Sequence, residues 1–134
     1  MPISIGFDPA LHLATVSYTG TIKSSDLVGA VDRLYTDARW QAGTATLWDG
    51  TAITTLFVAP GEIADLVEAH CRHTDAAAGS RNALLAVRDD DRLISALFIT
   101  LVRTLPAAYR LFTDRAAALT GLHEGDGLDE GDER

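Results

Sequence analysis

The feature that most constrains the fold of this chain is a regular change between two hydrophobic periodicities along its first 122 residues. Apolar residues alternate with polar ones over residues 3–7 and again over residues 11–18, with Asp8-Pro9 between the two runs. Alternation of this kind is typical of strands, and a Pro-containing turn between two such runs predicts a β-hairpin. The apolar residues after Gly20 recur instead at helical spacing to about Asp37.

In the rest of the chain, short β-rich segments alternate with amphipathic helical segments. Strands are predicted at residues 44–48, 83–87 and 109–112, and helices at residues 24–37, from residue 60 to about 71, from residue 89 through the apolar run to 105, and at 115–122. Strands separated by helices require parallel neighbours joined by right-handed crossovers. We therefore expect an α/β fold in which four helices pack on a mixed, mostly parallel five-stranded sheet, in the order ββαβαβαβα.

Length and charge predict one domain, residues 1–122, followed by an acidic tail, residues 123–134. The net charge is −8, and the tail holds six acids and one Arg, which leaves 13 acids and 10 bases for the domain. The tail alternates Gly with acids, so we expect a flexible, solvated extension. An acidic surface without a basic stripe argues against nucleic acid and anionic membranes as partners. No apolar run is long enough to span a bilayer and the first residues lack a secretory pattern, so we expect a cytoplasmic protein without membrane insertion.

A Thr-rich segment between a strand and a helix is the first candidate site. The predicted strand ends in Asp49, a loop carrying Thr51, Thr54 and Thr55 follows, and Pro60 opens the next helix. The loop has no His, Cys, Lys or Arg, so it lacks a nucleophile and base pair. We expect Asp49 to accept loop N–H groups rather than to act in catalysis, and we predict a protein that is not an enzyme and has no catalytic residues.

Three groups of side chains have the composition of metal ligands. The Asp triplet at 89–91 and the acidic tail could bind a divalent cation, and His70 and His73 share one helical face, as two zinc ligands do. Each group also has a structural explanation. Carboxylates cap helix N-termini, and His is favoured near a helix C-terminus by the dipole. We predict no metal and no cofactor, and we expect the single cysteine, Cys71, to be buried as a small apolar residue.

The third predicted helix carries an unusually broad apolar surface. At about 100° per residue, its apolar side chains cover roughly half of the circumference. Deep burial of the helix would explain this breadth, and so would a homodimer face or one wall of a pocket for an apolar ligand. The residues predicted for such an interface or ligand wall are Leu97, Phe98, Ile99, Leu101 and Val102.

Several short motifs resemble the STAS domain of SpoIIAA-like anti-sigma-factor antagonists, and in particular its divergent stand-alone bacterial branch. They are Tyr18-x-Gly20, Trp48-Asp49, Pro60-x-Glu62-Ile63, Ala83 to Val87 and Arg110-Leu-Phe-Thr-Asp114-x-x-Ala117, and the likeness extends over residues 3–122. The resemblance implies the SpoIIAA-like fold. It also implies a switch motif in which a serine is phosphorylated by a partner kinase. Asp49-Gly-Thr51-Ala-Ile53 matches the first half of that motif, but Val58 stands where the modifiable serine would be.

The sequence thus leads to one preferred function and two alternatives. We expect a non-enzymatic, STAS-like regulatory module that acts by contact with a protein partner or with itself, as a homodimer, without the usual phosphorylatable serine. The first alternative is a carrier or sensor of a small apolar ligand or lipid, because lipid binding occurs in places among related domains. The second is a phospho-switched antagonist that uses a loop threonine, Thr51, Thr54 or Thr55.

Overall fold

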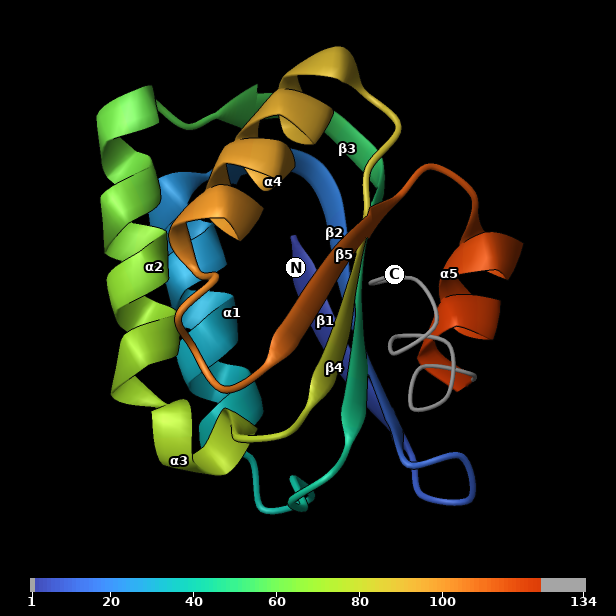
Figure 1. Ribbon diagram of the computed structural model, residues 1–134. Coiled ribbons are helices and arrows are strands. Elements are labelled where there is room, and N and C mark those ends of the chain that lie inside the picture. The colour runs from blue at the N-terminus through green and yellow to red at the C-terminus, as the bar shows by residue number, and fades with distance from the viewer. Residues whose placement is uncertain (1, 124–134) are drawn as a thin grey trace, which may run out of the picture.

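A five-stranded sheet with helices on both faces makes up the protein, as the computed structural model of residues 2–123 shows (Figure 1). The predicted tail, apart from His123, lies outside the described residues. The strands are β1 (Ile3–Asp8), β2 (Leu13–Lys23), β3 (Ala45–Phe57), β4 (Arg81–Leu85) and β5 (Ala108–Phe112). The helices are α1 (Ser24–Thr36), the 3-10 turn η1 (Pro60–Glu62), α2 (Ile63–Arg72), α3 (Thr74–Ala77), α4 (Asp89–Leu101) and α5 (Arg115–His123).

The strands lie side by side in the order in which they occur along the chain, β1-β2-β3-β4-β5. β1 is antiparallel to β2, and every later pair is parallel. Each parallel pair is connected through helical structure, because parallel neighbours need a crossover. The predicted α/β class, the mixed sheet and the ββαβαβαβα order are therefore confirmed, with the short α3 as an additional fifth helix.

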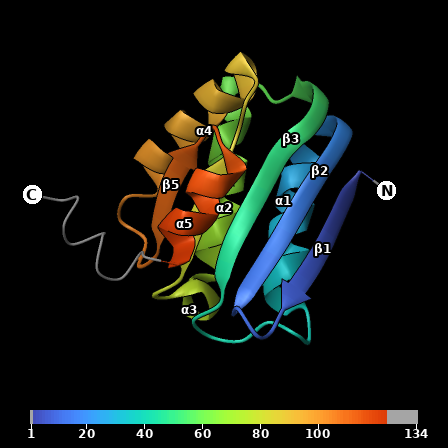
Figure 2. The same cartoon turned by 90° about the vertical axis from the view of Figure 1, so that its right-hand side faces the viewer.

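The helices divide unequally between the two faces of the sheet. α1, α2 and α4 lie on one face, and α5 lies on the other, where it leaves β1 and most of β2 uncovered (Figures 1 and 2). The larger core cluster joins α1 to β2 and β3 through residues such as Val16, Ile22 and Leu34. A smaller one fastens α5 to the opposite face through Leu47, Leu85 and Leu122. α2 packs between α1 and α4 and so closes the layer of helices.

The prediction of a Thr-rich loop after Asp49 is wrong, because β3 continues without a break to Phe57. Thr, Ile, Leu and Phe favour extended backbone, and this half of β3 pairs with the second half of β2. β2 itself runs past Gly20, which has a φ of +77°. The pairing of β2 with β3 shifts register twice, between Ser17 and Thr19 and between Gly20 and Thr21. The sheet thus accommodates Gly20 as a local irregularity of the strand.

Two further findings concern the helices. Cys71 is exposed, so its predicted burial is wrong: the buried side of α2 is formed by Ile63, Ala69 and His70, and Cys71 lies one residue beyond that side.

Among residues 2–123, no helix has both the length and the apolar character needed to cross a membrane.

Candidate functional site

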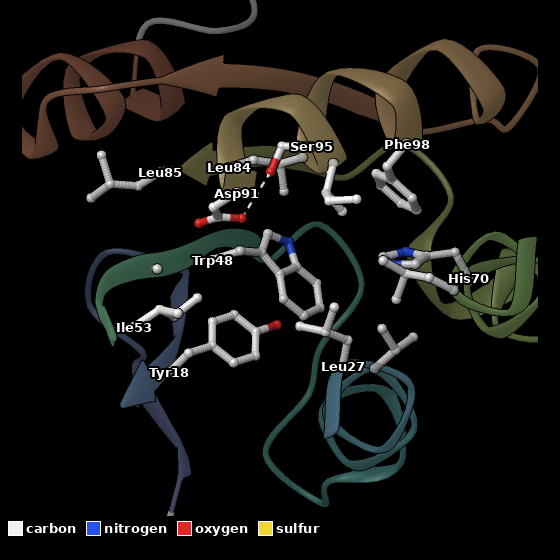
Figure 3. A pocket seen from close by; sticks show the side chains of 14 residues that line it. Tyr18, Leu27, Trp48, Ile53, His70, Leu84, Leu85, Asp91, Ser95 and Phe98 are labelled. Atoms are coloured by element: carbon white, nitrogen blue, oxygen red, sulfur yellow. Dashed lines mark hydrogen bonds between the residues drawn. The ribbon is translucent and has the colours of Figure 1, made fainter. Parts of the chain in front are cut away.

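A cavity of about 60 Å³ lies between the sheet and the layer of helices α1, α2 and α4 (Figure 3). Most of its wall is apolar, and four polar side chains reach it, those of Tyr18, His70, Asp91 and Ser95. The lining residues are Tyr18 from β2, Leu27 and Val31 from α1, Trp48, Gly50 and Ile53 from β3, Leu66 and His70 from α2, Leu84 and Leu85 from β4, and Asp91, Ile94, Ser95 and Phe98 from α4. An apolar hollow with a few polar groups directed into it is the usual form of a small-molecule site.

Aromatic rings form one end of the cavity. His70 is buried between Trp48 and Phe98, with ring centroids 5.5 and 4.8 Å from its own. Its Nδ1 forms a hydrogen bond of 3.1 Å with the hydroxyl of Tyr109. Burial lowers the pKa of His70 to about 3, because an apolar environment disfavours the charged imidazolium. His70 is thus neutral near pH 7 and contributes a wall of the cavity without charge.

A carboxyl group enters the cavity from the opposite end. Asp91 lies in the first turn of α4, and burial raises its pKa to about 6, against the weaker opposing effect of a hydrogen bond from Ser95. The Ser95 hydroxyl lies 3.4 Å from Asp91 Oδ1. Gly50 makes this position available: a Cβ added there would stand 2.5 Å from Asp91 Oδ2 and 3.2 Å from the carbonyl oxygen of Leu85.

The predicted capping of α4 by the Asp triplet is found only in part: the N-cap residue is Arg88, which has no side-chain cap hydrogen bond, and within the triplet Asp90 binds one N–H of the first turn. Asp90 Oδ1 accepts the Asp91 backbone N–H at 2.8 Å and also pairs with the Arg88 guanidinium. This bonding lowers the pKa of Asp90, chiefly through the Arg88 side chain. The triplet is therefore divided between an exposed ion-paired carboxylate and an inward-facing acid.

Tyr18 supplies a hydroxyl group on the sheet side of the cavity. Its side chain points from β2 into the hollow, and the residue is only 7% exposed (Figure 3). Burial, together with the nearby Asp91, raises the pKa of Tyr18 well above its ordinary value, so the phenol keeps its proton. Among residues 2–123 this hydroxyl has no hydrogen-bond partner, but it is not fully enclosed; the fully buried side-chain atoms without a partner are Tyr35 Oη and Thr46 Oγ1.

The region expected to correspond to the family switch lies away from this cavity. Asp49 points to the α5 face, where its Oδ1 accepts hydrogen bonds from the Thr51 N–H (2.9 Å) and hydroxyl (2.7 Å), and its Oδ2 pairs with Arg115 at 2.6 Å. Asp49 thus accepts one backbone N–H, that of Thr51, which lies in β3 and not in the loop that the sequence predicted. Thr54 is exposed and Thr55 half-buried, both within β3, and Val58 packs partly buried between the two helix-side clusters.

Comparisons with known proteins identify the fold. No protein-family model matches this chain, and no match was found among curated proteins. A solved structure from Shewanella loihica PV-4, described as an uncharacterized protein of the DUF3478 family with a SpoIIAA-like fold, superposes with a TM-score of 0.57. The two chains share 16% identity, and the alignment covers 90% of this chain and 91% of the other. This chain has a SpoIIAA-like fold. The resemblance seen in the sequence is confirmed at the level of the fold.

The SpoIIAA-like framework separates the residues predicted on the third helix, α4, into two groups. Phe98 and Val102 are buried, Ile99 packs partly buried beside them, and Phe98 lines the cavity. Leu97 and Leu101 point outward, with 40% and 54% of their surface exposed. Leu93, one turn earlier, is 61% exposed and continues the same line of leucines. The inner group of α4 residues thus contributes to the cavity wall, and the outer group forms an apolar stripe on the surface.

The two histidines of α2 do not converge on a common point. His70 bonds to Tyr109 inside the core, whereas His73 Nε2 lies 2.7 Å from Asp32 Oδ1, beside the Arg72 guanidinium. Across the part of the chain that the structure describes, no three His, Cys, Asp or Glu side chains are arranged to hold a metal ion.

The sequence did not lead us to place Tyr18, Asp91 and Ser95 in a common cavity. Asp91, Ser95 and Phe98 are spaced by four and three residues, which places them on one face of a helix, and this spacing was the available signal. Tyr18 carried a weaker one, since it continues the alternation of Ala14 and Val16 on the buried side of β2. That both elements face the same hollow depends on the tertiary packing.

Proposed function

We propose that the protein is a non-enzymatic interaction module that self-associates through the outer face of α4. The observation that carries this proposal is the leucine stripe, defined as Leu93, Leu97 and Leu101, which are 61%, 40% and 54% exposed. Residues four apart lie one above the other on a helix, so the three side chains form a continuous apolar line along one 13-residue helix. Continuous apolar patches of this kind mark contact surfaces.

A second copy of the chain suits this stripe. An isologous contact places the same patch on both subunits, and two antiparallel copies of α4 would pack leucine against leucine. In that arrangement the acidic first turn of one helix, with Asp89 and Asp90, approaches the exposed Arg103 that follows the last turn of the other. Opposite charges at the two ends favour this register over a parallel one.

Light scattering after size exclusion, across a series of protein concentrations, tests this proposal. We expect wild type to form a dimer and Leu97→Asp to form a folded monomer, because a charge at the centre of the stripe would be desolvated in the contact. Leu11→Asp is the matched control: Leu11 is 50% exposed, precedes β2 and lies outside α4, so the dimer should persist. A wild-type monomer at every concentration would overturn the proposal.

The cavity favours a second function, binding of a small ligand with apolar character. It lies where the sequence led us to expect a ligand wall, beside Phe98 and beneath α4. Fluorescence of Trp48, which lines the cavity, offers a direct readout of occupancy. For the phospho-switch alternative, the geometry offers little support, because Thr51, Thr54 and Thr55 lie inside a strand rather than at a helix N-terminus.

A further inference from the structure

One end of the cavity carries the Asp91 carboxylate, and within the described part of the chain no cationic side chain in the cavity wall balances its charge. Asp91 extends its carboxyl group into the hollow, and none of the residues that line the hollow is Arg or Lys. Arg92, the next residue in sequence, is exposed and does not line the hollow, and Arg88 forms its ion pair with Asp90 at the surface. A carboxylate removed from water without a cationic partner is costly. A bound cation would reduce that cost.

The hydroxyl of Tyr18 is a second, independent indication of a ligand. The Tyr18 residue is more than nine-tenths buried, its hydroxyl is directed into the hollow, and no described residue hydrogen-bonds to it (Figure 3). The hydroxyl is not fully enclosed by protein atoms, so its hydrogen-bonding capacity is open to a molecule in the hollow. The Tyr18 oxygen can accept a hydrogen bond from a ligand in the hollow. Asp91 lies near enough to Tyr18 to contribute to its raised pKa.

We propose that this cavity binds a small organic cation, a protonated primary amine with a short apolar tail. The ammonium group pairs with the Asp91 carboxylate and donates a hydrogen bond to the Tyr18 hydroxyl. The tail lies against Trp48, Ile94 and Phe98. This inference rests on the second proposed function, ligand binding, and adds the chemical class of the ligand.

Size and wall chemistry both fit such a ligand. A single water needs roughly 10–15 Å³ measured in this way, so a cavity of about 60 Å³ has room for about five groups of that size. Aromatic faces attract cations, and the rings of Tyr18 and Trp48 stand in the wall. A short alkylamine with four carbons has the corresponding number of heavy atoms.

Among the residues that the structure describes, no charged side chain other than Asp91 lines the cavity in competition with the ligand. Tyr18 from β2 keeps its proton, His70 from α2 is neutral, and α1, β3 and β4 contribute no charged side chain to the lining. On α4 itself, Asp89 and Arg92 are exposed outside the lining, and Asp90 pairs with Arg88, the residue before the helix. The ionisation of Asp91 is therefore the charge change that an amine would sense between about pH 5 and pH 8.

The expected pH dependence follows from the pKa of about 6 for Asp91. Only about a tenth of the carboxyl groups are ionised at pH 5, and almost all are ionised at pH 8. An alkylamine resembles a Lys side chain and stays protonated over this range. The affinity for the amine should thus rise about tenfold from pH 5 to pH 8, whereas the affinity for a neutral alcohol of the same size should not rise.

Titration of the full chain with n-butylamine and with n-butanol, followed by amide chemical shifts and Trp fluorescence, tests this proposal. We expect n-butylamine to bind more tightly than n-butanol at pH 8, with the tenfold pH effect. Asp91→Asn should remove both the preference for the amine and its pH dependence, and Tyr18→Phe should weaken amine binding severalfold. Asp89→Asn makes the same charge change on an exposed residue of the same turn and should leave binding unchanged.

The outcomes separate the class of ligand from the existence of a ligand site. Binding of n-butanol as tight as that of n-butylamine would overturn the cation while keeping a ligand-binding function. Shift changes confined to surface residues, or amine binding that is equal in wild type and Asp91→Asn, would show attraction to the acidic surface and overturn the proposal. Failure of both compounds to bind would overturn this inference and the second proposed function together.

Discussion

The contact between Gly50 and Asp91 shows how one missing methyl group shapes the cavity. Asp91 can turn inward only because β3 has no Cβ at residue 50, and the carboxyl oxygen occupies the space that a side chain would take. The same turn of α4 could otherwise have kept all three Asp residues in water. Gly50 is thus needed for the close approach of Asp91. Its backbone conformation does not require glycine, because its φ lies outside the left-handed region.

Gly50→Ala should therefore destabilise the protein by about 1–3 kcal/mol, as overpacking does. The new Cβ would meet Asp91 Oδ2, and the Leu85 carbonyl oxygen at 3.2 Å limits the room for relief. Urea unfolding measures the loss. Gly6→Ala is the control, because nothing lies within 4 Å of a Cβ at that position in β1. Equal unfolding midpoints for the two variants would show that the carboxyl group moves away freely.

At the scale of elements, α5 is held to the sheet by a small apolar contact and by polar contacts near both of its ends: Arg115 pairs with Asp49, and the Arg81 side chain donates a hydrogen bond to the Leu122 carbonyl oxygen. Ala118 and Leu122 provide its buried side, and Arg115 in its first turn reaches Asp49 on β3. The Asp49 side chain is 12% exposed and the Arg115 side chain 54%. Asp49 also holds the N–H and hydroxyl of Thr51, so it serves the strand and the helix at once.

Asp49→Ala should consequently cost more than Arg115→Ala. Loss of the carboxylate leaves several donors without their acceptor, which typically costs about 1–3 kcal/mol. Loss of the exposed guanidinium removes one ion pair, which is worth less than about 1 kcal/mol. Chemical denaturation of both variants checks the order. Equal losses would instead place the whole effect in the ion pair.

At the scale of the whole molecule, the buried His70 and the partly buried Asp91 change the stability with pH in opposite directions. The folded-state pKa of His70 is about 3, below the ordinary value of about 6.5, so its contribution to stability is lost as the pH falls from about 6.5 to 3. The folded-state pKa of Asp91 is about 6, above its ordinary value, so its contribution is present at low pH and is lost as the pH rises through 6.

Asp91→Asn should therefore be more stable than wild type above pH 7, and the difference should shrink toward pH 4. A pKa difference of about two units corresponds to roughly 2–3 kcal/mol at most, and partial exposure reduces it. Urea unfolding free energies measured from pH 4 to pH 8 test the trend, with Asp89→Asn as the control in the same turn. A difference that is constant with pH would contradict the assignment of the titration to Asp91.

Both residues lie on the same cavity, which connects stability to the proposed functions. A ligand that pairs with Asp91 would remove the destabilisation above pH 6, and ligand binding to the folded state raises stability by mass action. The leucine stripe is on the outer side of the same helix, so α4 carries the cavity wall on one face and the proposed dimer contact on the other.

Periodicity was sufficient to predict most elements of this protein because it reports local burial. Alternation over residues 3–7 and 11–18 corresponds to β1 and β2, and the apolar spacing after residue 89 corresponds to α4. Predictions failed where pairing was not local. The segment after Asp49 became strand because β2 lies beside it, and Cys71 became exposed because α2 turns a different side to the core.

Spacing along the chain was enough to predict the order of strands and helices, the mixed sheet and the broad apolar surface of the third predicted helix. The tertiary structure decided which leucines of α4 stay in water and which residues meet in the cavity. Tyr18, Gly50 and Asp91 come from three separate elements, and only packing brings them together. Burial then sets the pKa of Asp91, which no pattern in the sequence could do, since burial belongs to the folded molecule.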